Sequence, residues 1–427
     1  MRNSIKRGRG VGLLSAAVGV VLSLSACAGV AAPPSVTLTE QPTGDLPAAS
    51  VEALNAALAE AMALAAAPGA IAGVWAPWSG RWVSAQGTTA PGGTEKLSAD
   101  MRFRVGDNTQ PMTCDVLYGL VADGVVALDD EVSAYLPSIQ SVQGITLGQL
   151  CHGTSGLGDF GNTLGSLFAS NPTRQWSTLE LVSDGIANSR TGRPGESYAP
   201  SDTNYALLGL ALEKATGNTA KTLYDRYVFG RLGMKDSLFP DPTTVEISDP
   251  FVPGWEALKS PDGTPACDAP KDESLLSNSQ AFTAGGVVSS IDDLQRYAQS
   301  FAAGALLTDE LRDKAWETVP LSADAPAWQS FGPGGMQIGP MRGQAGYIPG
   351  HISAMLSDPE TGLTVVVLLN NSTAGAGFAQ TLAMKLAAIA AKAQPVEGEK
   401  LPLVGLPWSE EQMTERLAAS AVCQPAG

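Results

Sequence analysis

Two histidines are the first candidates for chemistry in this 427-residue chain, because each lies close to a serine. His152 precedes Ser155 by three residues, and His351 precedes Ser353 by two. A histidine beside a serine can act as the general base that activates the hydroxyl for acyl transfer. Neither serine belongs to the Gly-x-Ser-x-Gly elbow that exposes the nucleophile in one large class of hydrolases. We therefore expect both histidines to be ordinary loop residues.

The composition also argues against metal, phosphate and nucleic-acid sites. The five cysteines are scattered and the chain has no Cys-x-x-Cys or His-Glu-x-x-His, so no zinc site is expected. Gly156-Leu157-Gly158 does not follow a good parallel strand, which disfavours a phosphate loop. The net charge of −16 opposes binding to nucleic-acid phosphates or anionic lipids through the general field. We expect no metal, no cofactor and no nucleic-acid partner.

The N-terminus is typical of an export signal. Residues 2–9 carry four positive charges, residues 11–26 are apolar and small, and Leu24-Ser25-Ala26-Cys27 resembles a bacterial lipobox. The resemblance implies a lipoprotein signal peptide over 1–26 and a lipid on Cys27, which would hold the protein at the extracytoplasmic face of the cell membrane. An ordinary signal peptide is the alternative. Residues 27–50, rich in Ala, Pro and Thr, are expected to form a flexible tether.

The body of the chain begins and ends with strands. A helix at 51–66 with Ser50 as its cap, followed by a hairpin of 70–76 and 81–86, opens it. Further helices are predicted at 109–122, 125–136, 178–188, 202–216, 219–230, 291–303 and 375–393, and further strands at 331–338, 345–356 and 363–370. Such an order indicates a helical block inserted into one sheet. The last 30 residues, with several prolines, have the character of an appended tail.

Six blocks together resemble the exported serine β-lactamases of class C type and their relatives, the D-alanyl-D-alanine carboxypeptidases and esterases. They include Phe103-Arg104-Val105-Gly106, Thr154-Ser155-Gly156-Leu157, Thr203-Asn204-Tyr205 and Gly346-Tyr347-Ile348-Pro349-Gly350, within 103–112, 128–137, 145–157, 194–210, 284–290 and 346–350. The resemblance implies an α/β fold of the β-lactamase/transpeptidase type: a mostly antiparallel sheet flanked by terminal helices, plus a helical subdomain. The domain would span 51–394, with the subdomain inserted at about 107–280 and a tail over 395–427.

The resemblance also implies where catalytic residues should lie, and this chain lacks them there. The family uses a serine that opens a buried helix, a lysine three residues later, a tyrosine in a Tyr-x-Asn turn, and a strand with Lys-x-Gly or His-x-Gly. The matching positions are Asp107, Gln110, Pro200, Asp202 and Gln344, and no lysine in the chain has a serine three residues before it. We expect no catalytic residue here and a degenerate pocket formed by Asp107, Gln110, Asp202, Gln344, Gly346 and Tyr347.

Two interpretations of Asp107 and Gln110 are open. Asp-x-x-Gln before an apolar helix is a capping-box pattern, and an anion at a helix start is favoured by the helix dipole. Alternatively, the carboxylate lies in the old pocket and repels peptides or β-lactams that carry a carboxylate.

The resemblance further suggests a disulfide between Cys114 and Cys151, similar to the single disulfide of some class A β-lactamases. Cys267 and Cys423 would then pair by elimination, with buried free thiols as the alternative.

A binding or scaffolding role in the cell envelope follows as the main functional hypothesis. The protein would be a catalytically inactive lipoprotein whose cleft binds a peptidoglycan-like peptide or whose surface binds an envelope protein. One alternative is a hydrolase (β-lactamase, carboxypeptidase or esterase) with residual or unorthodox activity. Another is a structural envelope protein whose cleft is filled by side chains such as Gln110 and Gln344.

Overall fold

The computed structural model describes residues 35–36, 38, 41–260 and 263–424, which belong to one compact unit beginning at Pro33. The predicted signal peptide, Cys27 and residues 28–34 of the tether lie outside the described residues. The end of the predicted tether is not a flexible linker, because Leu46 is buried and residues 48–50 belong to the first helix, Ala48–Leu64. Within the described part of the chain, no helix has both the length and the apolar character needed to cross a membrane.

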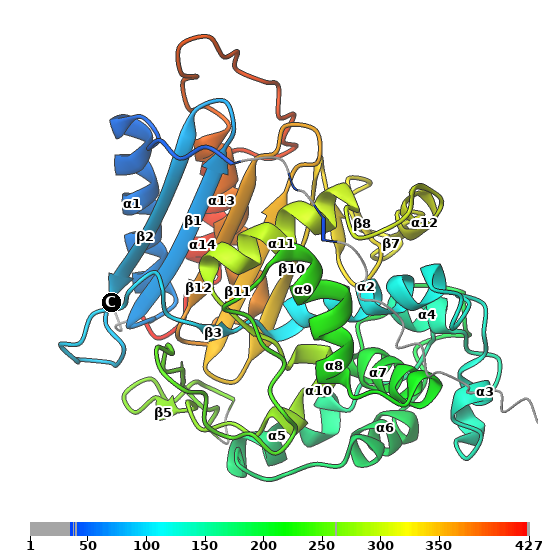
Figure 1. Cartoon of the computed structure of the whole chain (residues 1–427). Coiled ribbons are helices and arrows are strands. Elements are labelled where there is room, and N and C mark those ends of the chain that lie inside the picture. Colours follow the sequence, from blue (N-terminus) through cyan, green and yellow to red (C-terminus); the bar gives the residue numbers. More distant parts are fainter. Residues whose placement is uncertain (1–34, 37, 39–40, 261–262, 425–427) are drawn as a thin grey trace, which may run out of the picture. The chain divides into compact units, whose positions relative to one another are not determined.

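An antiparallel sheet of eight strands forms the framework, with the order β2-β1-β12-β11-β10-β9-β8-β7 (Figure 1). Its strands are β1 Gly69–Ala76, β2 Gly80–Gly87, β7 Val319–Pro320, β8 Gln329–Phe331, β9 Met336–Ile338, β10 Met341–Ile348, β11 His351–Ser357 and β12 Thr364–Leu369. The N-terminal hairpin pairs with the last strand, with Ala70 opposite Leu369. The first and last strands of the chain are therefore neighbours in one sheet, although a long helical region separates them in the sequence. The strand pattern of the sequence predicts this arrangement.

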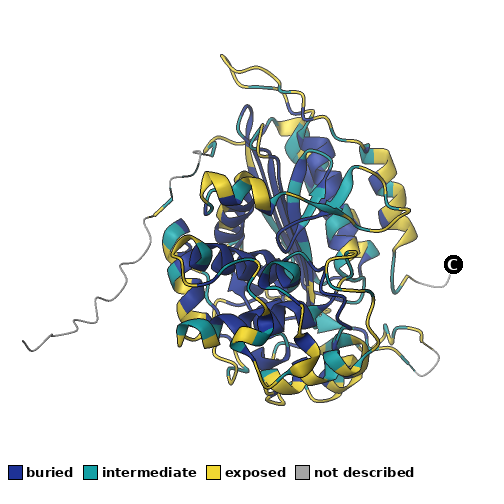
Figure 2. Cartoon of the chain, turned by 90° about the vertical axis from the view of Figure 1, so that its right-hand side faces the viewer, coloured by how far each residue is buried: buried dark blue, intermediate teal, exposed yellow. Residues whose placement is uncertain are grey.

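Each central strand is apolar on both faces because helices cover both sides of the sheet. In β1, Ile71 and Trp75 belong to one core, whereas Ala72 and Val74 belong to the other. This alternation follows from the two-residue period of a strand, which sends successive side chains to opposite faces. Figure 2 shows the sheet and the helices against it largely buried, while the peripheral loops are exposed.

The terminal helices cover one face of the sheet. These are α1 Ala48–Leu64, α13 Ala376–Ala390 and α14 Glu410–Ala419. Leu58, Leu386 and Leu417 bring the three helices into the same core. The segment expected as an appended tail thus contributes a packed helix to the fold.

The other face carries α11 Ile291–Ala303 and the helical region. The helices of that region are α2 Thr109–Ala122, α3 Val132–Tyr135, α4 Leu147–Cys151, α5 Gly161–Ser170, α6 Thr178–Ala187, α7 Asp202–Thr216, α8 Ala220–Tyr224, α9 Gly230–Leu232 and α10 Phe282–Gly285, with α12 Asp309–Ala315 beyond α11. Residues Thr109 to Leu120 of α2 are all buried. Because α2 runs through the core, its N-terminal end is held firmly against the sheet.

Two disulfides fasten the described fold. Cys114 in α2 is joined to Cys151 at the end of α4, and Cys267 is joined to Cys423. These are the two pairs that the resemblance and elimination suggested.

Three predicted elements differ from the structure for local reasons. The predicted helix 125–136 is reduced to α3, because Asp130 accepts hydrogen bonds from the Ala127 N–H and the Tyr135 hydroxyl and so stabilises a loop before it. The predicted strands 331–338 and 345–356 are wrong as single strands. Each contains a turn, one with Gly334 in the left-handed region and the other at Pro349-Gly350.

The first helix begins earlier than predicted. It starts at Ala48 after Pro47 and has no side-chain cap, so the predicted capping role of Ser50 is wrong. The backbone N–H of Ser50 instead donates to the Pro47 carbonyl inside the first turn.

Candidate functional site

Residue 107 lies on a short 3-10 turn, η1 Gly106–Asn108, between the strand β3 Phe103–Arg104 and helix α2. Strand β10 passes very close to this turn. A Cβ atom added at Gly346 would lie 2.1 Å from the Val105 carbonyl oxygen and 2.8 Å from the Asp107 nitrogen, so only glycine fits there. The Tyr347 backbone N–H donates a hydrogen bond to the Asp107 carboxylate. An N–H in this position could otherwise serve an oxyanion above the helix start, and here the carboxylate uses it.

Amide side chains form the floor behind Asp107. Gln110 Nε2 donates to Asp202 Oδ1 at 3.0 Å, and Gln344 Nε2 donates to Gln110 Oε1 at 3.4 Å and to the Gly334 carbonyl at 3.1 Å. Gln344 Oε1 accepts from the Ala345 N–H at 3.0 Å. Amides have no titratable group near neutral pH, so this chain of hydrogen bonds orders the floor without supplying a base.

The capping-box interpretation of Asp107 and Gln110 is wrong. The residue before α2 is Asn108, and neither that helix nor the η1 turn has a side-chain cap. Both predicted capping side chains point their polar atoms to β10 and Asp202 instead. The structure therefore places the Asp107 carboxyl group in the cleft, where the second interpretation expects it.

A third carboxyl group, Asp159, joins Asp107 and Asp202. Asp159 Oδ1 accepts hydrogen bonds from the backbone N–H of Asp202 at 3.2 Å and of Gly161 at 3.1 Å. Sequence reasoning missed Asp159, because nothing in its local sequence distinguishes it and only its tertiary contact with residue 202 reveals its place.

The three acids repel one another in a poorly solvated place. Burial, then the negative charges of Asp202 and Asp159, raise the pKa of Asp107 well above its ordinary value, although the Tyr347 N–H opposes this. Burial and then Asp159 raise the pKa of Asp202 to about 7, with the Gln110 hydrogen bond opposing. Burial also raises the pKa of Asp159. At neutral pH the carboxyls therefore share protons, because ionising all three together is unfavourable.

A cavity of about 730 Å³ opens over these acids, and its described lining combines carboxyl groups with apolar side chains. Asp107, Asp159 and Asp202 line it, as do Phe160 and Phe168. A second cavity of about 240 Å³ is bordered by the same three acids together with Gln110, Pro200, Tyr198 and Gln344. The structure therefore brings together the predicted pocket residues and leaves space beside them. The alternative of a cleft filled by Gln110 and Gln344 is wrong.

Tyr198 lies two residues before Pro200, the position at which the resemblance implies the family's tyrosine. Its ring stacks on Phe331 with centroids 4.1 Å apart. Burial, and then the charges of Asp107 and Asp202, raise the pKa of the Tyr198 hydroxyl far above its ordinary value. A phenol held neutral in this way is a poor proton acceptor, so Tyr198 does not replace the missing tyrosine as a base.

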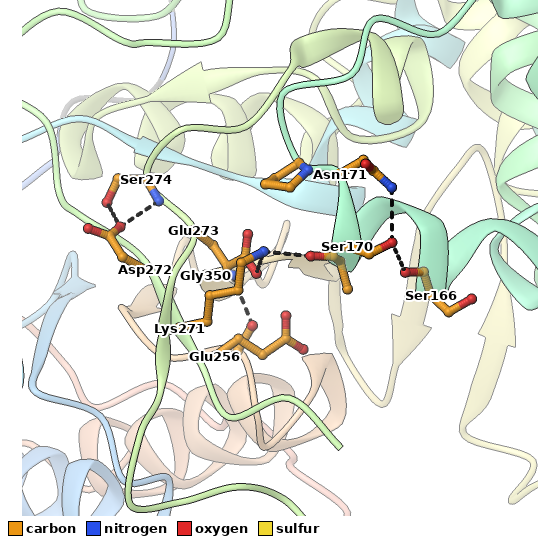
Figure 3. Close-up of polar contacts among 12 residues, drawn as sticks. Ser166, Ser170, Asn171, Glu256, Lys271, Asp272, Glu273, Ser274 and Gly350 are labelled. Carbon is orange, nitrogen blue, oxygen red and sulfur yellow. Dashed lines mark hydrogen bonds and ion pairs between the residues drawn. The ribbon is translucent and has the colours of Figure 1, made fainter. Parts of the chain in front are cut away.

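A second polar group lies on the other wall of the cavity. Tyr347, which lines the cavity, donates from its hydroxyl to Glu256 Oε1 at 2.8 Å. Figure 3 shows Glu256 near the fully buried Glu273, with Lys271 reaching Glu273 at 2.8 Å between nitrogen and oxygen. Lys271 also donates to the Ala169 carbonyl at the end of α5. This wall is thus acidic too, with Lys271 as its local counter-ion.

The two histidines have structural surroundings. Burial lowers the pKa of His152 to about 4, and its Nε2 lies 3.1 Å from the Tyr118 hydroxyl. Burial lowers the pKa of His351 to about 3, and its Nε2 lies 2.9 Å from the Val252 carbonyl.

The serines beside these histidines have other partners. Ser155 Oγ pairs with the side-chain oxygen of Asn204, and Ser353 donates to the Val105 carbonyl at 2.8 Å. These contacts agree with the expectation that neither histidine serves as a base for its neighbouring serine.

Metal binding finds no support in the described part of the chain. No group of three or more His, Cys, Asp or Glu side chains there is arranged to hold a metal ion. The hydrogen bonds of the acids in the cleft come from an amide and a backbone N–H. Gln110 donates to Asp202, and the Asp202 N–H donates to Asp159.

Comparison with known proteins agrees with this geometry. The family model for β-lactamases matches residues 54–389. A penicillin-binding protein of Bacillus subtilis (strain 168) is 23% identical, over 65% of this chain and 63% of its own length. The D-alanyl-D-alanine-carboxypeptidase/endopeptidase AmpH of Escherichia coli (strain K12) is 25% identical, over 67% of this chain and 75% of its own length.

Solved structures share the fold. A D-stereospecific amidohydrolase from Streptomyces sp. is 27% identical with a TM-score of 0.64, covering 74% of this chain and 94% of its own. The D-amino acid amidase from Ochrobactrum anthropi SV3 has a TM-score of 0.65 at 22% identity, covering 75% of this chain and 92% of its own. Because the family model matches residues 54–389, well over half of the sequence, the chain belongs to the β-lactamase family.

Proposed function

We propose that this protein is a β-lactamase-family member that binds ligands in its cleft without hydrolysing them. One observation carries the proposal. At the start of the buried helix α2, where the family has its nucleophile, lies Asp107, whose carboxylate accepts the Tyr347 N–H and whose neighbours across the floor are Gln110 and Asp202. No lysine or arginine lies among the described residues of that floor.

The chemistry of acyl transfer supports this proposal. A hydrolase of this kind needs an activated hydroxyl, a base and an oxyanion site, and these groups act as a unit. Asp107 supplies no hydroxyl, Gln110 and Gln344 supply no base, and the Tyr347 N–H is already bonded to a carboxylate. Loss of one such group alone costs orders of magnitude in rate.

Location in the cell envelope is part of the proposal. The lipobox-like Leu24–Cys27 favours a lipid anchor at Cys27 on the extracytoplasmic face of the membrane, and a peptidoglycan-like peptide or an envelope protein is the proposed partner. The carboxypeptidase/endopeptidase name of one relative is in keeping with an envelope peptide.

The test is the intact protein mass after exposure to a reactive penicillin, together with release of D-alanine from a D-alanyl-D-alanine peptide. An active serine β-lactamase treated in parallel is the positive control. We expect no covalent adduct and no D-alanine release. A covalent adduct on any residue, or any turnover, would refute the proposal. Its loss in the Asp107→Asn variant would identify the Asp107 carboxylate as the nucleophile.

A further inference from the structure

We propose that the loop of residues 395–407, between α13 and α14, docks on the lipid surface of a membrane, and that the cleft lies at the far end of the sheet from that surface. The inference rests on the proposed lipid anchor at Cys27 and adds how the anchored protein is oriented. It is carried by the exposed apolar side chains of the loop, by the packing of its base, and by the end of the fold at which the tether joins the body.

Exposed apolar side chains gather in this loop. Leu403 is 94% exposed, Val396 is 51% exposed and Leu401 is 47% exposed. The other large apolar side chains that are exposed in the described chain are spread over separate segments: Val125, Leu167, Leu179, Leu275 and Tyr347. A single exposed leucine is ordinary on a protein surface, but a group of apolar side chains in one loop is typical of an interaction site.

The base of the loop is packed, so fraying does not explain the exposure of its tip. The Val396 N–H donates to the Trp78 carbonyl at 2.9 Å. At the other end of the loop, Val404 and Trp408 are buried in the core that the terminal helices share, and the Trp408 indole donates to the Met384 carbonyl at 2.9 Å. The fold therefore presents the apolar tip to solvent instead of covering it.

The loop lies over one end of the sheet. Its base is held by the Trp78 carbonyl at the β1–β2 turn, and a Cβ added at Gly339, in the turn before β10, would lie 2.6 Å from Pro407 Cδ. Figure 1 shows both turns and the loop, the orange-red segment between α13 and α14, at the same end of the sheet. The N-terminal segment crosses this end too, because the Arg81 N–H donates to the Gly44 carbonyl at 2.8 Å.

The tether reaches the body at this end of the fold. The Val36 N–H donates to the Arg231 carbonyl at 2.8 Å, and Arg231 Nη1 donates to the Leu306 carbonyl at 2.8 Å. Shortly before Leu306, the Ala302 carbonyl accepts from Arg342 Nη1 at 2.7 Å, where β10 begins. The start of β10 is the end of that strand nearest the loop, as Figure 1 shows.

A short tether restricts how the anchored body can turn. The body begins at Val36, nine residues after Cys27, and nine extended residues span about 30 Å at most. A compact unit of about 390 residues is roughly 50 Å across. Because the tether is shorter than the body, the end that it joins, which carries the apolar loop, is held near the membrane.

The charges of the loop determine which lipid surface it suits. Glu397, Glu399 and Lys400 are all exposed in it. Charged side chains stay in water or among headgroups, so the leucines reach only the boundary between headgroups and acyl chains. The net charge of −16 opposes anionic lipids through the general field. A zwitterionic surface therefore suits the loop best, because the contact is apolar and meets no net charge.

The orientation has a consequence for the cleft. Strand β10 runs from Met341 at the loop end to Tyr347 in the cavity lining, about 20 Å further along the strand. Contact of the loop with lipid therefore places the cavity beside Asp107 at the end of the sheet farther from the membrane. A ligand in the envelope could reach the cavity there without meeting the lipid surface.

Coupling through Cys27 tests the contact without relying on lipidation in cells. Cys27 is the one cysteine outside the two disulfides, so a chain that begins at Cys27 can be joined through this thiol to phosphatidylcholine vesicles that carry a maleimide lipid. Trypsin then reports on the loop through Lys400, and Arg190, exposed between α6 and α7, is the reference site. We expect cleavage at Lys400, relative to Arg190, to slow by at least about fivefold on coupling.

Leu403→Asp and Leu179→Asp are a matched pair of variants, each compared with its own uncoupled form. Leu403→Asp replaces the most exposed apolar side chain of the loop and should abolish the protection of Lys400. Leu179 is exposed in the first turn of α6, where the helix dipole favours an acidic residue, and its replacement adds the same charge. Leu179→Asp should leave Lys400 protected.

Three results would overturn the inference. The first is cleavage at Lys400 that coupling leaves unchanged. The second is protection that survives in Leu403→Asp, because the surface would then shield the loop without an apolar contact. The third is protection in the uncoupled protein that grows with protein concentration, because a second copy of the chain would then cover the loop.

Failure of this inference is distinguishable from failure of the proposed anchor. If Cys27→Ala releases the protein from the membrane fraction of expressing cells but the coupled loop stays cleavable, the anchor stands and the docking of the loop is refuted. If Cys27→Ala leaves the protein in the membrane fraction, the anchor is refuted together with the orientation that depends on it.

Discussion

Replacing Asp202 by asparagine should stabilise the ligand-free protein by an amount that is absent near pH 4, grows as pH rises and is largest above about pH 7. Asp202 shares the base of the cleft with Asp107 and Asp159. Asparagine keeps an oxygen that can accept the Gln110 hydrogen bond, but it removes one of the three carboxyl groups whose ionisation is mutually unfavourable. A group retained for binding at a cost in stability is a common feature of functional sites.

The direction of the pH dependence follows from the raised pKa of Asp202. Between its ordinary value of 3.8 and the folded value of about 7, the folded protein holds a proton that the unfolded chain releases. The stability of the wild-type protein should therefore decrease as pH rises through this window. The asparagine variant lacks this titration, so its advantage should be absent near pH 4 and reach its full size above about pH 7.

The size of the effect can be bounded. One pKa unit corresponds to about 1.4 kcal/mol, so the shift from 3.8 to about 7 sets a ceiling of about 4 kcal/mol. Asp202 is partly exposed and shares its repulsion with two neighbours, so solvent screening reduces this ceiling. We expect about 1–2 kcal/mol, which is roughly 1–3 °C in Tm for a chain of this length.

Thermal unfolding followed by circular dichroism or calorimetry, from about pH 4.5 to about pH 8, measures this difference. Asp324→Asn is the control, since it changes the net charge equally at an exposed loop position. An Asp202→Asn variant that is no more stable than wild type at pH 8 would contradict the reasoning. A gain that is the same at every pH, or that Asp324→Asn reproduces, would show that local repulsion is not its cause.

Two other predictions concern the covalent features of the chain. Replacing Cys27 by alanine should release the protein from the membrane fraction of expressing cells, and a variant that stays anchored would show that this cysteine is not lipidated. Non-reducing peptide mapping should recover Cys114 joined to Cys151. Replacing both by alanine should lower the free energy of unfolding by about 3–4 kcal/mol for a 37-residue separation, whereas free thiols at both positions in the native protein would disprove the pairing.

Much of the fold could be predicted because its signals are local. Residues 363–369 are a run of apolar and β-branched side chains within the predicted strand 363–370, and the structure has β12 Thr364–Leu369 there, buried throughout. The helix α11 Ile291–Ala303 matches the predicted 291–303, and Ser290 caps it by accepting from the Asp293 N–H. The strands at 331–338 and 345–356 could not be separated into hairpins, because a single glycine or a Pro-Gly pair does not by itself show where a strand turns back.

For the candidate site too, the sequence predicts one part, the residue types, and leaves open another part, their contacts. The resemblance of the sequence to the family predicts that the positions of the nucleophile and bases carry Asp107, Gln110 and Gln344. It could not determine what those side chains contact. A helix cap and a cleft anion have the same local pattern of Asp-x-x-Gln, and they differ only in which distant groups lie nearby.

Only the tertiary structure decided that question. It places β10 against the start of α2, so the Tyr347 N–H reaches the Asp107 carboxylate, and it brings Asp159 and Asp202 together from 43 residues apart. Composition and motif depend on the order of residues along the chain, whereas charge repulsion, burial and an open cavity depend on which segments the fold places side by side. The proposed loss of the family's catalytic residues therefore rests on the sequence, whereas the acidic cleft at those positions arises from packing.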